Sequence, residues 1–253
     1  MIEYGLQLYS VRDVARNLPT VLKKVYDIGY RTVEFAGFYD YEPAFIKDCL
    51  DSIGLRAVGT HTSLSLLTED KIEKTAELHL AIGVKHLTVP SGNWSTKENF
   101  VKNIEILNFA NEALKSYGIE LGYHNHSSEF FKTPYGIVVE DEIIKQTDVN
   151  IELDTFWAYN ADINSLGFME THRERIKLIH LKDGFARSPI GACFENASRG
   201  AIGKSLGLGN APIVEVRNFA LKNKIHMIVE SEDLAPTGLI EVERCMEYLR
   251  SLE

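Results

Sequence analysis

The chain has 253 residues, of which 45% are hydrophobic and 25% charged, a composition typical of a soluble globular protein. Its net charge of −9 argues against general electrostatic binding of a polyanion, and no apolar run approaches the roughly 18 residues of a membrane helix. We therefore expect neither a nucleic-acid partner nor a membrane partner. Cys49, Cys193 and Cys245 fit no zinc or disulfide pattern, and no secretory leader precedes the first strand-like run, so we expect a cytoplasmic protein.

In chain order, eight short β-like runs alternate with stretches of helical length. We predict strands at residues 3–9, 31–36, 56–61, 85–90, 119–125, 150–155, 177–183 and 225–231. We predict helices at residues 18–28, 44–53, 69–82, 97–117, 139–145, part of 163–175, 212–223 and 239–252. The helices are indicated by apolar residues at helical spacing, as in Leu18, Val21, Leu22, Val25 and Ile28. A long segment containing Gly, Ser and Asn, 184–210, follows the seventh strand.

Four of the junctions between helix and strand share one pattern. Gly29, Gly54, Gly83 and Gly118 each stand where a helix ends and an apolar residue starts the next strand, and glycine tolerates the positive φ that such an end needs. They recur every 25 to 35 residues, which is the length of one βα unit. Eight such units predict an α/β fold, a (β/α)8 TIM barrel, as a single domain over residues 1–253. The alternative is a doubly wound open sheet.

Polar side chains on the strands share the parity that would face the barrel interior. Successive side chains of a barrel strand alternate between the helices and the interior. The inward parity carries Gln7, Glu34, His61, Thr88, His124, His126, Glu152, Asp154, His180, Lys182, Glu230 and Glu232. Those on the later strands stand near the carboxyl ends, where the active sites of barrels lie. The sequence therefore predicts a polar site assembled from several strand ends.

Carboxylates gathered in one barrel would repel each other unless a cation or a proton offset them, because burial of an unpaired charge is costly. His180 shares its inward parity with Asp154 and Glu230 and adds an imidazole to the group. Oxygen and nitrogen ligands without a thiolate suit one divalent ion, Mn²⁺, Mg²⁺, Co²⁺ or Zn²⁺, and do not choose among them. The alternative is a set of structural ion pairs with Lys182.

Two further features have two interpretations each, and two others have one. Trp157 is either a platform for the apolar face of a sugar or a core aromatic. Lys182-Asp183 is either a catalytic or substrate-anchoring pair or a salt bridge at the strand end. Residues 205–209 lack the spacing of a phosphate-binding loop and are interpreted as a flexible loop. The acidic run 140–142 is interpreted as the solvated start of a helix.

The chain resembles the xylose isomerase-like barrel superfamily, in the branch of the sugar phosphate isomerases/epimerases. The likeness covers nearly the whole length and is most specific in Tyr123-His-Asn-His126 with Glu129-Phe130, Glu152-Leu-Asp154 with Trp157-Ala158, Ile179-His-Leu-Lys-Asp183 and Val229-Glu230. The resemblance implies one divalent metal held by Glu, Asp, His and Glu from successive late strands. By that resemblance Asp154, His180 and Glu230 are the second, third and fourth ligands.

The first ligand is where this sequence departs from the family pattern. Many relatives have Glu-Asn-His at the end of the fifth strand, where this chain has His124-Asn125-His126. Either His124 binds the metal, or Glu129 reaches it from the following loop. We favour Glu129, because a further carboxylate would keep the usual charge balance of the site.

The resemblance also implies a chemistry, namely removal of a proton from a carbon next to a carbonyl or hydroxyl, with a metal that stabilises the enediolate. Glu230 and His126 are then the candidate acid/base catalysts of a sugar isomerase or epimerase. The small carbohydrate substrate would be contacted by His61, Glu34, His124, Trp157 and Lys182. No phosphate-binding loop accompanies these residues, so we expect a free sugar or a sugar derivative as readily as a phosphorylated one.

Three other functions remain open. A lyase, a dehydratase or a keto-glycoside-cleaving enzyme would use the same metal and base but expel a leaving group. A sugar-binding barrel without catalysis is favoured by the departure at His124. An endonuclease for damaged DNA, which the superfamily includes, is disfavoured by the acidic charge and the lack of a basic stripe. The resemblance allows a homo-oligomer, and no feature of the sequence decides it.

Overall fold

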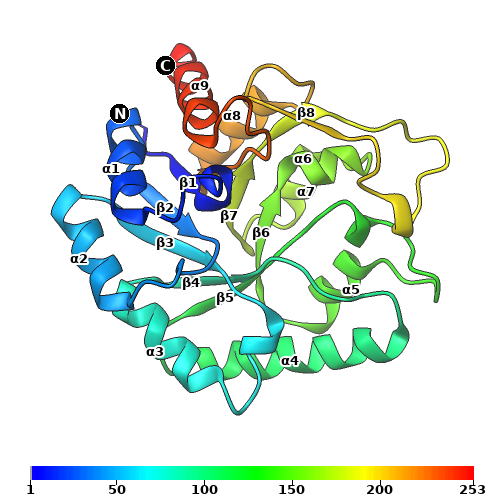
Figure 1. The fold of residues 1–253 in the computed structure, drawn as a ribbon. Helices are drawn as coiled ribbons and strands as arrows, with labels where there is room; N and C mark the ends of the chain where they lie inside the picture. Colours follow the sequence, from blue (N-terminus) through cyan, green and yellow to red (C-terminus); the bar gives the residue numbers. More distant parts are fainter. Residues whose placement is uncertain (1) are drawn as a thin grey trace.

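The computed structural model describes residues 2–253 and has a closed barrel of eight parallel strands surrounded by helices (Figure 1). The strand order around the barrel is β1, β2, β3, β4, β5, β6, β7 and β10, and β10 closes the ring against β1. The strands are β1 (Gly5–Gln7), β2 (Thr32–Phe35), β3 (Arg56–His61), β4 (His86–Val89), β5 (Glu120–His124), β6 (Asn150–Asp154), β7 (Ile176–Leu181) and β10 (His226–Val229). The predicted α/β TIM barrel is confirmed.

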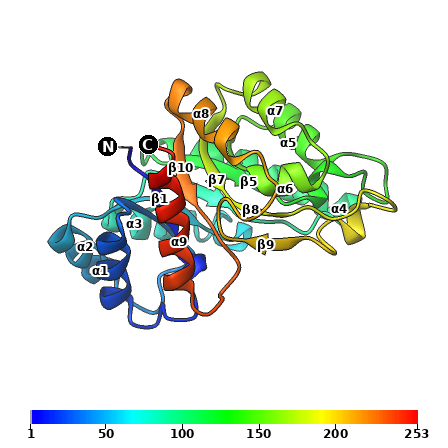
Figure 2. The same ribbon diagram turned by 90° about the horizontal axis from the view of Figure 1, so that it is seen from above.

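Nine α-helices occur within residues 2–253, and most of them cover the outside of the barrel (Figures 1 and 2). They are α1 (Leu18–Ile28), α2 (Pro43–Ile53), α3 (Ile72–Ile82), α4 (Lys97–Lys115), α5 (Val139–Gln146), α6 (Thr155–Asn160), α7 (Ser165–Thr171), α8 (Ile213–Asn223) and α9 (Gly238–Ser251). The last helix, α9, lies beside α1, so the two ends of the chain meet on one side of the barrel (Figure 2). None of these helices is long and apolar enough to cross a membrane.

The four predicted helix ends have the backbone that the glycine pattern requires. Gly29, Gly54, Gly83 and Gly118 have φ values of +127°, +76°, +89° and +68°, a region that residues with a Cβ rarely adopt. Helix α6 and a two-stranded hairpin, β8 (Asp183–Phe185) with β9 (Ile202–Lys204), were not predicted. Both are shorter than the span over which hydrophobic periodicity can be recognised.

The two faces of the barrel strands differ in chemistry. Outward side chains such as Leu6, Val33 and Phe35 are fully buried between strands and helices. The inward positions carry buried polar groups instead, among them Gln7 and Glu34, which stand opposite each other on β1 and β2. Because alternate side chains of every strand point inward in a closed barrel, these polar groups meet in its centre.

The glycine-containing segment after β7 is organised by one buried carboxylate, that of Asp183. Its two oxygens accept four backbone N–H groups, from Gly184 at 2.8 Å, Gly207 at 2.9 Å, Gly209 at 3.0 Å and Ala211 at 3.1 Å. A Cβ on Gly209 would lie 2.2 Å from the Asp183 carboxylate, so glycine is required there. The interpretation of residues 205–209 as a flexible loop is therefore wrong, because their backbone donors are held by one fixed acceptor.

We expect Asp183→Asn to destabilise the protein. An amide offers one acceptor oxygen in place of two and turns its N–H₂ toward backbone donors, which leaves buried N–H groups unpaired. The free energy of unfolding, measured by urea denaturation, should fall by about 2–4 kcal/mol. Asp148→Asn, at an exposed aspartate outside this network, is the matched control, and equal stability of both variants would contradict this account.

Candidate active site

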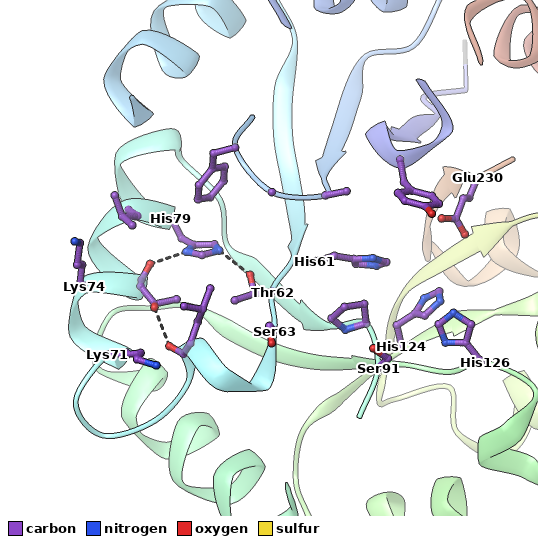
Figure 3. Close-up of a pocket in the computed structure, with 18 of the residues that line it drawn as sticks. His61, Thr62, Ser63, Lys71, Lys74, His79, Ser91, His124, His126 and Glu230 are labelled. Carbon is purple, nitrogen blue, oxygen red and sulfur yellow. Dashed lines mark hydrogen bonds between the residues drawn. The ribbon is translucent and has the colours of Figure 1, made fainter. Parts of the chain in front are cut away.

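A cavity of about 1260 Å³ opens at the carboxyl ends of the barrel strands (Figure 3). Its lining includes residues at or just after the ends of five strands: Ala36 after β2, His61 on β3, Pro90 after β4, His124 on β5 and Glu230 after β10. Strand ends from all around the ring thus contribute to one chamber, as the inward parity of the sequence predicted. Such a chamber at this end of a barrel is the default position for an active site.

Four buried side chains converge beside this cavity. One ligand atom from each of His124, Asp154, His180 and Glu230 can be chosen so that all lie within 4.8 Å of one another. Register explains part of this convergence, because Asp154 on β6 stands opposite His180 on β7. His180 Nδ1 lies 3.2 Å from Glu230 Oε2. Two carboxylates and two imidazoles at these spacings could hold a divalent ion.

Two atoms of this group make no hydrogen bond within residues 2–253, namely Asp154 Oδ2 and His124 Nδ1. Each has a charged neighbour nonetheless, because Lys182 Nζ lies 3.6 Å from Asp154 Oδ2 and Glu152 Oε1 lies 3.3 Å from His124 Nδ1. The other oxygen, Asp154 Oδ1, accepts a hydrogen bond from the backbone N–H of Trp157 at 2.8 Å and thereby caps the N-terminus of α6. The Asn125 side chain holds the backbone of Asp154 through two hydrogen bonds, of 3.0 and 3.2 Å. A buried acceptor without a hydrogen bond costs free energy. The Lys182 ammonium offsets part of the charge of Asp154 without hydrogen-bonding to Oδ2, so this fixed oxygen fits a further cation.

His180 is held on its far side by two carboxylates. Its Nε2 lies 2.7 Å from Glu34 Oε2 and 2.8 Å from Glu152 Oε1. Burial opposes the charge of His180, but Glu152, Glu230 and Glu34 outweigh it and hold its pKa well above the usual range. To bind a metal ion, His180 would have to lose its Nδ1 proton, while the Nε2–H donated to Glu34 and Glu152 keeps the ring oriented, as in the histidine ligands of metal sites. Glu34 can reach His180 because Gly59 has no side chain. A Cβ on Gly59 would lie 2.8 Å from Glu34 Oε1.

The supporting carboxylates are themselves fixed by the barrel. Gln7 donates to Glu34 at 2.8 Å, and Thr88 donates to Glu152 Oε2 at 2.7 Å. His61 Nε2 lies 2.9 Å from Glu152 Oε1, and its ring is stacked 5.4 Å from that of His180. The hydrogen-bond network therefore extends from β1 to β7 across the centre of the barrel.

The two central carboxylates have opposite pKa shifts. Burial, with the nearby charge of Glu152, raises the pKa of Glu34 to about 7. Burial also opposes ionisation of Glu152, but His180 and His61 outweigh it and hold the pKa of Glu152 well below its usual range. Two like charges so close are rarely both ionised, so Glu152 carries the negative charge and Glu34 gains a proton near neutral pH.

Lys182 supplies a buried positive charge next to the cluster. Its Nζ lies 3.1 Å from Glu230 Oε2 and 3.6 Å from Asp154 Oδ2, forms an ion pair with Glu232, and stands 4.7 Å from the centre of the Trp157 ring. Burial opposes the charge of Lys182, but the three carboxylates outweigh it and raise its pKa. The ion pairs with Lys182 that the alternative to a metal predicted are thus present at the strand ends. Asp183 takes no part in them, because it is engaged with backbone donors.

The structure does not bring Glu129 into the cluster. The Glu129 carboxylate accepts hydrogen bonds from the Tyr123 hydroxyl at 3.0 Å, the His126 N–H at 3.1 Å and the Ser128 hydroxyl at 2.8 Å. Its oxygens are thereby occupied on the helix side of β5, and His124 stands in the cluster in its place. Glu129 instead fixes the turn that carries His126.

The remaining predicted site residues fall into two groups. His61, His126 and Trp157 line the cavity, and the rings of His126 and Trp157 lie 5.9 Å apart. Glu34 has no exposed surface and lies behind His180, so it is not placed to touch a substrate in the cavity.

Sequence reasoning assigned no role to Glu152 and Glu232. Glu152 touches three imidazoles, those of His61, His124 and His180, and Glu232 lines the cavity and pairs with Lys182. The signal that could have found them was present, because both share the inward parity of the residues that were chosen.

The family model for xylose isomerase-like TIM barrels matches residues 22–251. This chain belongs to the xylose isomerase-like TIM barrel family. It is 27% identical over 191 residues to an inosose dehydratase of Bacillus licheniformis, covering 66% of this chain and 62% of that protein. It is 26% identical over 164 residues to a 2-oxo-tetronate isomerase of Haemophilus influenzae, covering 54% of this chain and 62% of that protein. The matched part is thus about 62% of the length of these curated relatives, which are enzymes.

Solved structures extend the likeness to the whole chain. A sugar phosphate isomerase/epimerase of Parabacteroides distasonis has a TM-score of 0.78 and 26% identity, and the match covers 98% of this chain and 93% of that one. A probable 3-DHS dehydratase of Bacillus anthracis has a TM-score of 0.75 over 98% of this chain and 99% of that one. Its 14% identity shows the shared fold alone.

The interpretation of the acidic run 140–142 as solvated is wrong for its first residue, Glu140. Glu140 is only 2% exposed, and its Oε2 has no hydrogen-bond partner within residues 2–253. Burial, with the charges of Glu129 and Asp141, raises the pKa of Glu140 to about 8. Glu140, which lies near Glu129 of the loop after β5, therefore keeps its proton at neutral pH.

We expect Glu140→Gln to remove a pH dependence of stability. The unfolded chain loses the Glu140 proton near the ordinary glutamate pKa of 4.5, whereas the folded protein keeps it up to about pH 8. Stability from this group is therefore complete below pH 4.5 and declines as pH rises to 8, by about 1.4 kcal/mol for each unit of separation at most. Thermal unfolding from pH 5 to 9 should show the variant gaining on the wild type as pH rises. Glu105→Gln, at an exposed glutamate of α4, should show no such trend, and a constant difference for Glu140→Gln would refute the assignment.

Proposed function

We propose that this protein is a metal-dependent isomerase or epimerase of a sugar or sugar derivative, which removes a proton from the carbon next to a carbonyl. The observation that carries the proposal is the buried oxygen of Asp154 that accepts no hydrogen bond, in a group of two histidines and two carboxylates. The group borders a large cavity at the active end of the barrel. Membership of a family whose named relatives include an isomerase and a dehydratase supports it.

His124, Asp154, His180 and Glu230 would hold one divalent ion, Mn²⁺, Mg²⁺, Co²⁺ or Zn²⁺. When bound, such an ion stabilises the negative charge that develops on the substrate oxygens during proton removal. His124 takes the first position in this proposal because the Glu129 oxygens are already engaged with Tyr123, His126 and Ser128. Glu34 and Glu152 are positioning residues that set the orientation of His180.

Glu230 and His126 are the proposed acid/base pair. Burial opposes the charge of Glu230, but Lys182 and His180 hold its pKa well below the usual range, so it is an anion that can accept a proton. His126, which follows β5, lies at the same end of the cavity as Glu230 (Figure 3). Its backbone N–H donates a hydrogen bond to the Glu129 carboxylate. A base and an acid on two sides of the substrate allow a proton to be removed from one atom and returned at another.

The sugar would be oriented by His61, Trp157 and Lys182. The indole N–H of Trp157 has no partner among the described residues, so it is a free donor for a sugar hydroxyl. The ammonium of Lys182 over the indole ring adds a charged donor beside the carboxylates. Direct hydrogen bonds of this kind separate substrates that carry a hydroxyl from analogues that lack it.

A dehydratase is the second candidate, favoured by the identity of 27% to an inosose dehydratase. Both reactions begin with the same proton removal and differ in the next step. An isomerase returns the proton to the neighbouring carbon, and a dehydratase, or a keto-glycoside-cleaving enzyme, expels a leaving group. Analysis of the product by mass, which is unchanged by isomerisation and lower after loss of water, distinguishes them.

Metal analysis tests the ligand set. Wild-type protein loaded with Mn²⁺, Co²⁺, Zn²⁺ or Mg²⁺ and then desalted should retain about one ion per chain by elemental mass spectrometry. His124→Ala and His180→Ala should lose it, and Glu129→Ala should keep it. Loss in Glu129→Ala with retention in His124→Ala would return the first ligand to Glu129. A wild type that retains no ion would overturn the enzyme proposal in favour of a sugar-binding barrel.

Exchange of a substrate hydrogen with solvent tests the base. Metal-loaded protein in D₂O should introduce deuterium into one carbon of a ketose or inosose, as followed by NMR, whether isomerisation or elimination completes the reaction. Glu230→Gln should slow this exchange by about 10²–10⁴-fold, because an amide cannot accept the proton. Glu247→Gln, at an exposed glutamate of α9, is the control, and undiminished exchange in metal-loaded Glu230→Gln would exclude the role.

A further inference from the structure

The cavity is much larger than the polar site needs. Its volume of about 1260 Å³ exceeds the roughly 300–1,000 Å³ of pockets that bind drug-sized ligands. A free hexose is well under half the size of such a ligand. The proposed catalytic residues occupy one end. In Figure 3, His124, His126 and Glu230 lie at that end, whereas His79, Lys71 and Lys74 lie at the opposite one.

The outer end of the cavity is walled by one face of α3 and by the short 3-10 helix before it. Lys71, Lys74 and Leu78 line the cavity at the spacing of a single helix face. Leu66, from the 3-10 helix, also lines it and is 44% exposed. The Thr75 hydroxyl donates to the backbone carbonyl of Leu66 at 2.8 Å, so the backbone that carries this apolar side chain is tied to α3.

Between the polar site and the lysines, the wall combines the apolar side chains of Phe38, Leu66 and Leu78 with the hydroxyls of Thr62, Ser63 and Ser91, and Asp70 stands beside the lysines. Phe38 closes it from the loop after β2, with its ring centre 5.4 Å from that of His79. The ring nitrogens of His79 are engaged with Thr60 Oγ1 at 2.7 Å, Thr62 Oγ1 at 3.0 Å and the Thr75 carbonyl. His79 therefore offers no free polar atom, and its contribution to the wall is the edge of a packed ring.

We propose that this outer compartment binds an apolar, aryl-sized substituent of the substrate, so that the ligand is a glycoside or similar sugar conjugate and not a free sugar. The inference rests on the proposed function, which places the sugar at the cluster. A second sugar unit would place some of its hydroxyl groups against Phe38, Leu66 and Leu78, which cannot hydrogen-bond to them. An aromatic ring would cover these side chains and pair with Phe38, while the exposed lysines remain in water at the rim.

The test compares ligands that differ only in this substituent. Phenyl and methyl glycosides of glucose, galactose and mannose are titrated calorimetrically into the metal-loaded protein. Burial of a phenyl ring should make the phenyl member of at least one pair bind about 10- to 100-fold more tightly than the methyl member. A panel in which no phenyl glycoside binds more tightly than its methyl counterpart overturns the proposal.

Two leucines of equal exposure provide the matched variants. Leu66→Ser, in the wall, should reduce the preference for phenyl over methyl to less than about threefold. Leu80→Ser, on α3 but outside the cavity and 43% exposed, should leave it unchanged. The two variants should have the same melting temperature, which shows that Leu66→Ser is folded. If such a Leu66→Ser variant keeps the full preference for phenyl over methyl, the proposal is also overturned.

Failure of this inference differs from failure of the proposed function. Retained metal and deuterium exchange without a phenyl preference remove the outer compartment from substrate binding and leave the catalytic proposal intact. A phenyl preference in a protein that holds no metal removes the catalytic proposal and leaves an apolar sugar-conjugate site.

Discussion

The site depends on the His180 imidazole, which is held between buried carboxylates on both of its nitrogens. Nε2 faces Glu34 and Glu152, and Nδ1 faces Glu230. Without the imidazole between them, these carboxylates would stand together in a low-dielectric interior, where like charges are costly. Without the carboxylates, the ring would have no fixed orientation. The groups in the polar centre of the barrel therefore depend on one another. The raised pKa of Glu34 and the lowered pKa of Glu152 are consequences of that dependence.

This polar centre explains features of the chain that have no direct contact with a substrate. Gly59 leaves the space into which Glu34 packs, and Asn125 aligns the backbone of Asp154 so that one of its oxygens caps α6 and the other stays free. Asp183 performs a parallel role outside the barrel, since it fixes the backbone of the segment after β9. Preorganisation of this kind keeps charged groups in place without a cost at the moment of reaction.

The barrel itself does not choose between isomerisation and elimination. Relatives of similar identity include a dehydratase and an isomerase, and both chemistries can start from the same removal of a proton. Function resides in the site and not in the fold. In this chain the outer cavity presents Phe38, Leu66 and Leu78 beyond the cluster, so the outer cavity carries information about the ligand that the catalytic cluster does not.

The sequence by itself determined the barrel, because each glycine-ended helix and each β-branched strand leaves a local pattern of fixed period. It also determined which residues face inward, because strand parity is a local property, and it thereby identified Asp154, His180 and Glu230 as neighbours. Only the tertiary structure showed that His124 lies in the cluster and Glu129 does not, since the hydrogen bonds that occupy Glu129 come from the fold of its own loop. It likewise decided the burial of Glu140, the anchoring by Asp183 and the apolar wall of the cavity, all of which depend on distances between segments that are remote in sequence.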